Sequence, residues 1–289
     1  MDTLRTALFF SHVAYGAYGA SSTSNDEDAW KEVQRSCGFD PTRIRAFECA
    51  KYDIGDTRFV YDIHEATDTL IVAFRGTKTW SDLVADITIY KDKLIDVCYT
   101  PYYLKHERPR SRDLPYVHQG FYEIFNLMKY EFLNVVNNYL YGESTEHRVS
   151  TKKRIVVTGH SLGGAISVIA SAMLYAHYHH LVEDDLLWIE NITFGAPKVG
   201  NAEFKRIYDD WMGRKMNHCI HYYHSSDPVP SVPFIQFYAL SKAHCVNRTC
   251  ESLLYGSQYH HLESYRDRIL QAEEPEICLT EFQRKNGMS

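Results

Sequence analysis

The sequence has few of the features that mark specialised classes of protein. Its seven cysteines are an odd number and form no Cys-x-x-Cys pair, which argues against a structural zinc site or a complete disulfide framework. Glycine (15) and proline (9) are too scarce for a collagen-like or disordered chain. Basic residues (31) are outnumbered by acidic ones (37), so the positive surplus of a dedicated nucleic-acid binder is missing. No apolar run is long enough to span a bilayer.

What remains is typical of a globular protein with a full core. Hydrophobic residues make up 45% of the 289-residue chain and charged residues 24%, and a chain of this length buries most of its apolar surface without cross-links. No internal repeat or low-complexity tract interrupts it. We therefore expect one domain over residues 1–289.

The compartment stays open on sequence grounds. The first twenty residues contain the apolar run 7–10, but polar residues interrupt it, which favours a packing helix over a signal peptide. This weak leader and the odd number of thiols favour the cytoplasm. A glycosylation sequon at 247–249, enclosed by Cys245 and Cys250, would instead suit a secreted protein with a short disulfide loop.

Short apolar runs alternate with helical patterns along the middle of the chain. Continuous apolar runs predict strands that are buried on both faces, and their alternation with helices predicts a largely parallel sheet, an α/β fold with helices on both sides. The expected strands are 58–63, 70–74, 155–158, 188–194 and 219–224, and the expected helices are 119–140, 162–180 and 200–213.

The sequence Gly159-His160-Ser161-Leu162-Gly163 lies between an expected strand and an expected helix. A serine on such a sharp turn has strained backbone angles, and the positions two before and two after it must lack side chains. Gly159 and Gly163 meet this need. The turn also places the N–H of Leu162 at a helix N-terminus, where it can stabilise a developing oxyanion. Ser161 is therefore a candidate nucleophile.

At these residues the sequence resembles the fungal-type class 3 lipases of the α/β-hydrolase superfamily. The resemblance implies an α/β-hydrolase fold with a mostly parallel central sheet, helices on both faces and a short helical lid. It also implies a serine hydrolase of lipid esters that needs no cofactor or metal. Five blocks carry it, in family order: residues 72–77, 117–121, 157–165, 193–201 and 227–230.

A serine hydroxyl needs an imidazole to take its proton and a carboxylate to orient that imidazole. By residue type alone Asp227-Pro228 is an ordinary turn, but the resemblance implies that Asp227 is the acid. The family's terminal signature matches His261, which we expect to be the base. His260 stands next to it and leaves the choice within the pair open, and His244 is a further candidate without a matching signature.

Three other histidines could suggest a metal site. His218, His221 and His224 are spaced by three residues, which would line one side of a helix. They fall on an expected strand, where a step of three residues changes face. We therefore expect no zinc here.

The segment after residue 76 carries the expected oxyanion donor and lid. The resemblance implies that Thr77 donates to the oxyanion and that Asp86 orients the Thr77 hydroxyl. The amphipathic spacing of residues 80–87 predicts a short helix, and the resemblance implies that it is a lid in transient contact with a lipid interface. The apolar face of this helix consists of Trp80, Leu83, Val84 and Ile87.

The expected activity is hydrolysis of triacylglycerol or a related acylglycerol through a Ser161-His261-Asp227 triad and an acyl-enzyme. Phospholipase A1, feruloyl-type esterase or acyltransferase chemistry at the same site remains open. A lipase-like scaffold that binds lipid or protein without turnover is a further alternative. A panel of esters with different chain lengths and head groups separates these activities.

Overall fold

The chain folds around a central sheet of seven strands. The computed structural model describes residues 2–16, 24–49, 57–76, 94–96, 114–142, 149–233, 237–246 and 257–271. Within them the strands lie in the order β1-β2-β3-β6-β7-β8-β9. These strands are β1 (Arg45–Cys49), β2 (Thr57–His64), β3 (Thr69–Phe74), β6 (Lys153–His160), β7 (Leu187–Phe194), β8 (His218–Tyr223) and β9 (Ala243–Cys245).

The sheet is parallel from β3 to β9, and antiparallel only where β1 pairs with β2 and β2 with β3. Its parallel strands end at the same edge, where loops that leave β6, β7 and β8 can meet. A separate antiparallel pair joins β4 (Leu94–Asp96) to β5 (Tyr116–His118).

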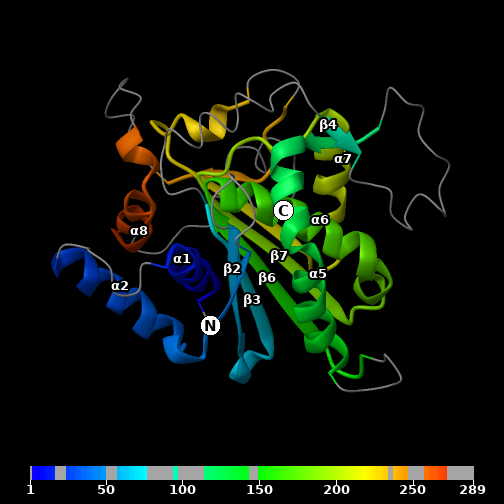
Figure 1. The fold of residues 1–289 in the computed structure, drawn as a ribbon, viewed down its shortest axis with the longest axis horizontal. Helices are drawn as coiled ribbons and strands as arrows, with labels where there is room; N and C mark the ends of the chain where they lie inside the picture. The colour runs from blue at the N-terminus through cyan, green and yellow to red at the C-terminus, as the bar shows by residue number, and fades with distance from the viewer. Residues whose placement is uncertain are drawn as a thin grey trace, which may run out of the picture.

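Helices cover both faces of the sheet (Figure 1). One face carries α1 (Thr3–Ala14), α2 (Ser24–Cys37) and α8 (Leu262–Gln271). The opposite face carries α5 (Gln119–Tyr141), α6 (Leu162–Glu183) and α7 (Ala202–Trp211). Short 3-10 turns complete the described elements: η1 (Pro41–Arg43), η2 (Glu65–Thr67), η4 (Val229–Ser231) and η5 (Ser257–His260).

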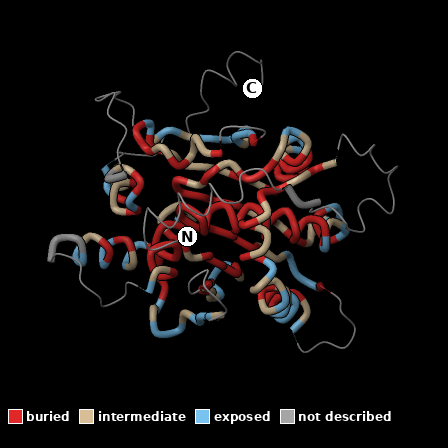
Figure 2. The backbone as a smooth tube through the Cα atoms, turned by 45° about the horizontal axis from the view of Figure 1, so that its top comes forward, coloured by how far each residue is buried: buried red, intermediate tan, exposed pale blue. Residues whose placement is uncertain are grey.

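The alternation of side chains along each strand divides the core into two clusters. On β3, Leu70 and Val72 pack with α5 and α6, whereas Ile71 and Ala73 pack with α1. All six residues of β3 are buried, as a strand covered on both faces requires. Figure 2 shows the result, with the buried backbone concentrated in the centre and the exposed segments around it.

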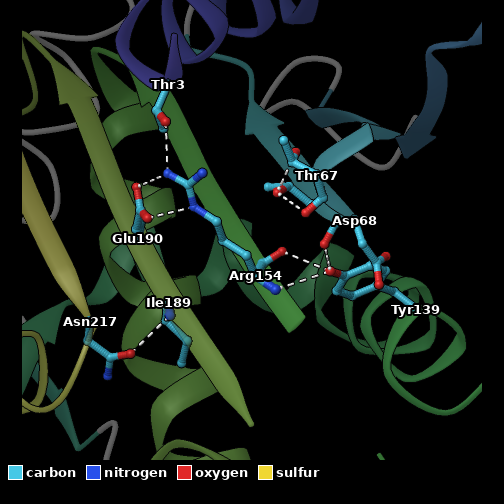
Figure 3. A network of polar contacts seen from close by, with 9 residues as sticks. Thr3, Thr67, Asp68, Tyr139, Arg154, Ile189, Glu190 and Asn217 are labelled. Atoms are coloured by element: carbon cyan, nitrogen blue, oxygen red, sulfur yellow. Dashed lines mark hydrogen bonds and ion pairs between the residues drawn. The ribbon is translucent and has the colours of Figure 1, made fainter. Parts of the chain in front are cut away.

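Polar contacts fix the end of the sheet at which β6 begins (Figure 3). The guanidinium of Arg154 donates to both carboxylate oxygens of Glu190 on β7, at 2.7 and 2.9 Å, and to the hydroxyl of Thr3 on α1. The Tyr139 hydroxyl on α5 accepts from the backbone N–H of Arg154 and donates to the carbonyl of Asp68. This network connects the strands to helices on both faces.

The predicted α/β architecture is confirmed, and each of the eight expected strands and helices is present with shifted ends. The N-terminal segment forms α1, whose side chains from Thr6 to Ala14 are buried, as a packing helix requires. The direction of β2 is the main difference, because it runs antiparallel to β3. No helix among the described residues is long and apolar enough to cross a membrane.

Candidate active site

Ser161 lies in the turn between β6 and α6. Its backbone angles are φ 58° and ψ −129°, a left-handed conformation that a residue with a side chain rarely adopts. Its N–H donates to the carbonyl of Phe194 at 2.9 Å. A Cβ added at Gly159 would collide with the backbone of Gly163, and one added at Gly163 would collide with the carbonyl of Phe74. The strained turn predicted from the glycine spacing is therefore present.

Leu162 is the first residue of α6 and is 5% exposed. The N–H groups of a first helical turn have no partner within their own helix, and the helix dipole adds a partial positive charge at this end. The carbonyl of Ser161 already accepts the N–H groups of Gly164 and Ala165. The start of α6 can thus stabilise negative charge beside the Ser161 hydroxyl.

An imidazole bridges the serine to a carboxylate, and it belongs to His260. Its Nε2 lies 2.7 Å from the Ser161 hydroxyl oxygen, and its Nδ1 lies 2.8 Å from Oδ2 of Asp227. Serine and aspartate are each 2% exposed, and the histidine is 8% exposed. Three side chains from distant parts of the sequence therefore form one hydrogen-bonded chain.

The expectation that His261 occupies this place is wrong. His261 is exposed, whereas His260 is buried. The two residues stand where η5 ends and α8 has not yet begun, so successive side chains point in different directions. The backbone carbonyl of His261 accepts the N–H of Ser264 at 3.0 Å and so supports the start of α8.

The Asp227 carboxylate is fixed by two further donors. The backbone N–H of Val229 donates to Oδ1 at 2.9 Å, and the Tyr265 hydroxyl donates to Oδ2 at 2.6 Å. The Tyr265 oxygen in turn accepts the N–H of His224 at 3.2 Å. Burial, followed by the Asp227 charge, raises the pKa of Tyr265 well above its usual value, so the hydroxyl remains a donor. The sequence analysis assigned no role to Tyr265 and missed this contact.

The remaining sequence candidates lie elsewhere. His221 Nδ1 lies 2.8 Å from the Thr193 hydroxyl, and His224 Nδ1 accepts the N–H of Ser226 at 3.1 Å. No three potential metal ligands gather in the part of the chain that the structure describes. His244 is on β9, where its ring lies 6.0 Å from that of Tyr222.

Several expectations fall outside the described residues. They concern the oxyanion donor Thr77, its support Asp86, the sequon at 247–249 and Cys250. They also concern the apolar face of the lid, which consists of Trp80, Leu83, Val84 and Ile87. They stay predictions.

A cavity of about 280 Å³ lies beside the acid. Asp227 forms part of its wall, together with Val168 of α6, Pro230 and Tyr238. Apolar side chains dominate this wall, and Asp227 is the one member of the hydrogen-bonded chain that lines it.

Comparisons with known proteins identify one family. Residues 71–237 match the family model for lipase (class 3). A lipase of Rhizopus niveus is 31% identical over 166 residues, which make up 57% of this chain and 35% of the fungal protein. The protein named phospholipase A1-II 1 of Oryza sativa subsp. indica is 24% identical over 175 residues, which make up 57% of this chain and 39% of the rice protein.

Solved structures show the same fold. The crystal structure of Lip2 lipase from Yarrowia lipolytica matches with a TM-score of 0.58 and 20% identity, over 85% of this chain and 78% of that one. With the mostly parallel sheet and its two helical layers, this likeness identifies an α/β-hydrolase fold. The chain matches less than two fifths of the length of the two curated relatives above.

Proposed function

The chain belongs to the class 3 lipase family, and from that premise we propose that it is a serine hydrolase of lipid carboxylic esters. The observation that carries the proposal is the hydrogen-bonded chain from Ser161 through His260 to Asp227. It supplies the three roles that ester hydrolysis by serine requires, which are nucleophile, proton carrier and orienting carboxylate.

The Ser161 oxygen attacks the ester carbonyl carbon while its proton moves to Nε2 of His260. His260 then gives this proton to the departing alcohol, and the acyl group stays on Ser161. A water molecule, deprotonated by His260, attacks the acyl-enzyme; the fatty acid departs as His260 returns this proton to the Ser161 oxygen. Asp227 holds the Nδ1–H of His260 and stabilises the imidazolium that forms in each half of the cycle.

The negative charge on the carbonyl oxygen needs donors. We assign the N–H of Leu162 to this task because it lies at the start of α6, directly after the nucleophile. The second donor in the proposal is the N–H of Thr77, which follows the end of β3 by three residues. No metal or cofactor takes part in the proposed reaction.

Acylglycerols are the proposed substrate class, with transient contact between the enzyme and a lipid surface. The similarity to the Rhizopus niveus protein named lipase supports this choice. The rice relative is named as a phospholipase A1, and its match is the reason to retain a phospholipid substrate as the second candidate.

The test compares wild type with Ser161→Ala on emulsified tri-, di- and monoacylglycerols and on phosphatidylcholine. We expect hydrolysis by the wild type, and a decrease in kcat of about six orders of magnitude in the variant. A phosphonate ester should label the wild type at Ser161 and leave the variant unlabelled. Release of fatty acid by Ser161→Ala at the wild-type rate would refute the proposal, and cleavage confined to phosphatidylcholine would support the second candidate.

A further inference from the structure

A second chain of hydrogen bonds begins at the end of α1 and ends at His260. Tyr15 directly follows α1, and its hydroxyl lies 2.8 Å from Nδ1 of His160. Nε2 of His160 lies 2.6 Å from the backbone carbonyl of His260. The rings of the two histidines are 4.7 Å apart. The proposed mechanism assigns no role to either Tyr15 or His160.

The carbonyl fixes the direction of every bond in this chain. A carbonyl oxygen only accepts, so Nε2 of His160 carries the proton and donates to it. In the neutral ring Nδ1 is then an acceptor, and the Tyr15 hydroxyl donates a hydrogen bond to it. The Tyr15 oxygen remains free to accept, and it receives the backbone N–H of Gly76.

Burial keeps both side chains uncharged. It is the main cause that raises the pKa of Tyr15 far above its usual value, although the nearby Arg75 acts in the opposite direction. Burial, followed by the charge of His260, lowers the pKa of His160 well below its usual value. Neither group therefore exchanges protons near neutral pH, and the chain acts through geometry.

Gly76 is packed so closely that only glycine fits. A Cβ added there would collide with the Tyr15 hydroxyl and would lie 2.7 Å from the carbonyl of His160. Gly76 follows β3 and immediately precedes Thr77, the expected oxyanion donor. The Tyr15 hydroxyl thus holds the N–H of the Arg75–Gly76 peptide, one residue before the expected donor in the sequence.

The Tyr15 hydroxyl consequently contacts both Gly76 and His160. Through Gly76 it reaches the segment that leads to the oxyanion donor, and through His160 it reaches the backbone of the general base. The platform beneath it is rigid, because α1 packs against β3, β6 and β7 and is buried from Thr6 to Ala14. In Figure 1, α1 lies on the face of the sheet that also carries α2 and α8.

We infer that Tyr15 is a positioning residue for ester hydrolysis, which holds the Arg75–Gly76 peptide directly and the His260 backbone through His160. This inference rests on the proposed function. It assigns to the N-terminal helix a task in turnover in addition to its packing against the sheet.

The test is Tyr15→Phe, which removes the hydroxyl and keeps the ring. We expect kcat to fall about 10- to 100-fold, the range that holds for the outer hydrogen-bond partners of metal ligands. KM should stay within about twofold because uniform substrate binding is unchanged. Active sites are counted with a phosphonate ester, so a partly unfolded sample cannot imitate the effect. Hydrogen exchange of the Gly76 amide, measured by NMR, should become faster in the variant.

Tyr178→Phe is the matched control. Tyr178 is also buried, and its hydroxyl donates to Asn137 at 2.8 Å, but it lies on α6 seventeen residues beyond Ser161, about 25 Å along the helix. We expect this variant to match the wild type in kcat and in Gly76 exchange.

The outcomes separate the inference from the proposed function. A Tyr15→Phe enzyme with kcat within twofold of an active wild type, or with a change in KM alone, would overturn the inference and leave the proposed function intact. A wild type that hydrolyses no ester would overturn the proposed function and the catalytic task of Tyr15 together. Faster Gly76 exchange in Tyr15→Phe would even then support the contact itself.

Discussion

Replacing the two neighbouring histidines one at a time should separate the general base from a bystander. In His260→Ala the Ser161 hydroxyl loses the ring nitrogen that lies 2.7 Å away, and Asp227 loses the N–H at 2.8 Å. Loss of the proton acceptor of a catalytic triad lowers kcat about 10⁶-fold, which raises the barrier by about 8 kcal/mol. We expect a decrease of this size in His260→Ala.

His261→Ala is the matched control, one residue away. The side chain of His261 is exposed, and its structural contact with Ser264 uses the backbone carbonyl, which the substitution retains. We expect kcat within about twofold of the wild type, as is usual for surface substitutions.

The assay measures fatty acid release from an emulsified acylglycerol. The enzyme concentration is the concentration of folded protein, because His260→Ala should react poorly with an active-site label. If His261→Ala loses the activity and His260→Ala retains it, the assignment of the base and the geometry from which it is argued are both refuted. Equal, moderate losses in the two variants would also contradict it, because they would indicate a general effect on the start of α8.

Two further predictions concern the acid and the N-terminal helices. Tyr265→Phe removes a 2.6 Å hydrogen bond to Asp227. Because a hydrogen bond to a charged group contributes about 1.5 to 3 kcal/mol, kcat should fall roughly 10- to 100-fold. An unchanged kcat would show that Val229 and His260 suffice to hold the acid. Burial, helped by Arg266, lowers the pKa of His12 to about 4 from 6.5, so the unfolded chain binds more protons between these values and stability decreases as the pH falls through this window. Urea unfolding should show about 2 kcal/mol less stability at pH 5 than at pH 7 from this group, and His12→Gln should remove that part of the difference.

The interior of the fold could be predicted because burial on both faces leaves a clear pattern. β3 and the middle of β6 are continuous apolar runs, and the structure buries them between α1 on one face and α5 and α6 on the other. The direction of a strand leaves no such pattern. The sequence of β2 is compatible with either direction, and the short connection through η2 is what makes it pair antiparallel with β3.

The edge strands and the outer helix α2 were harder to predict because they are not buried on both faces and so lack continuous apolar runs. β1 is mostly exposed or partly exposed, and β9 has only three residues, so neither produces an apolar run. On α2 the buried apolar side chains are Trp30, Val33 and Cys37, three positions in a strongly polar helix. Their spacing fits one helical face, but three apolar residues are too few to predict an amphipathic helix clearly. In the structure they pack against α1.

The choice between His260 and His261 depends on packing that a motif does not contain. Leu262, Tyr265 and Ile269 of α8 are buried against the cluster that includes α1, and this packing fixes how the helix is rotated about its axis. The same rotation directs the Tyr265 hydroxyl to Asp227. His260, at the end of η5, then faces the same carboxylate, and His261 faces solvent. The apolar contacts of α8 therefore determine which of the two histidines, His260 or His261, reaches Asp227. Polar substitutions at Leu262 or Ile269 should for that reason disturb the triad without touching any of its members.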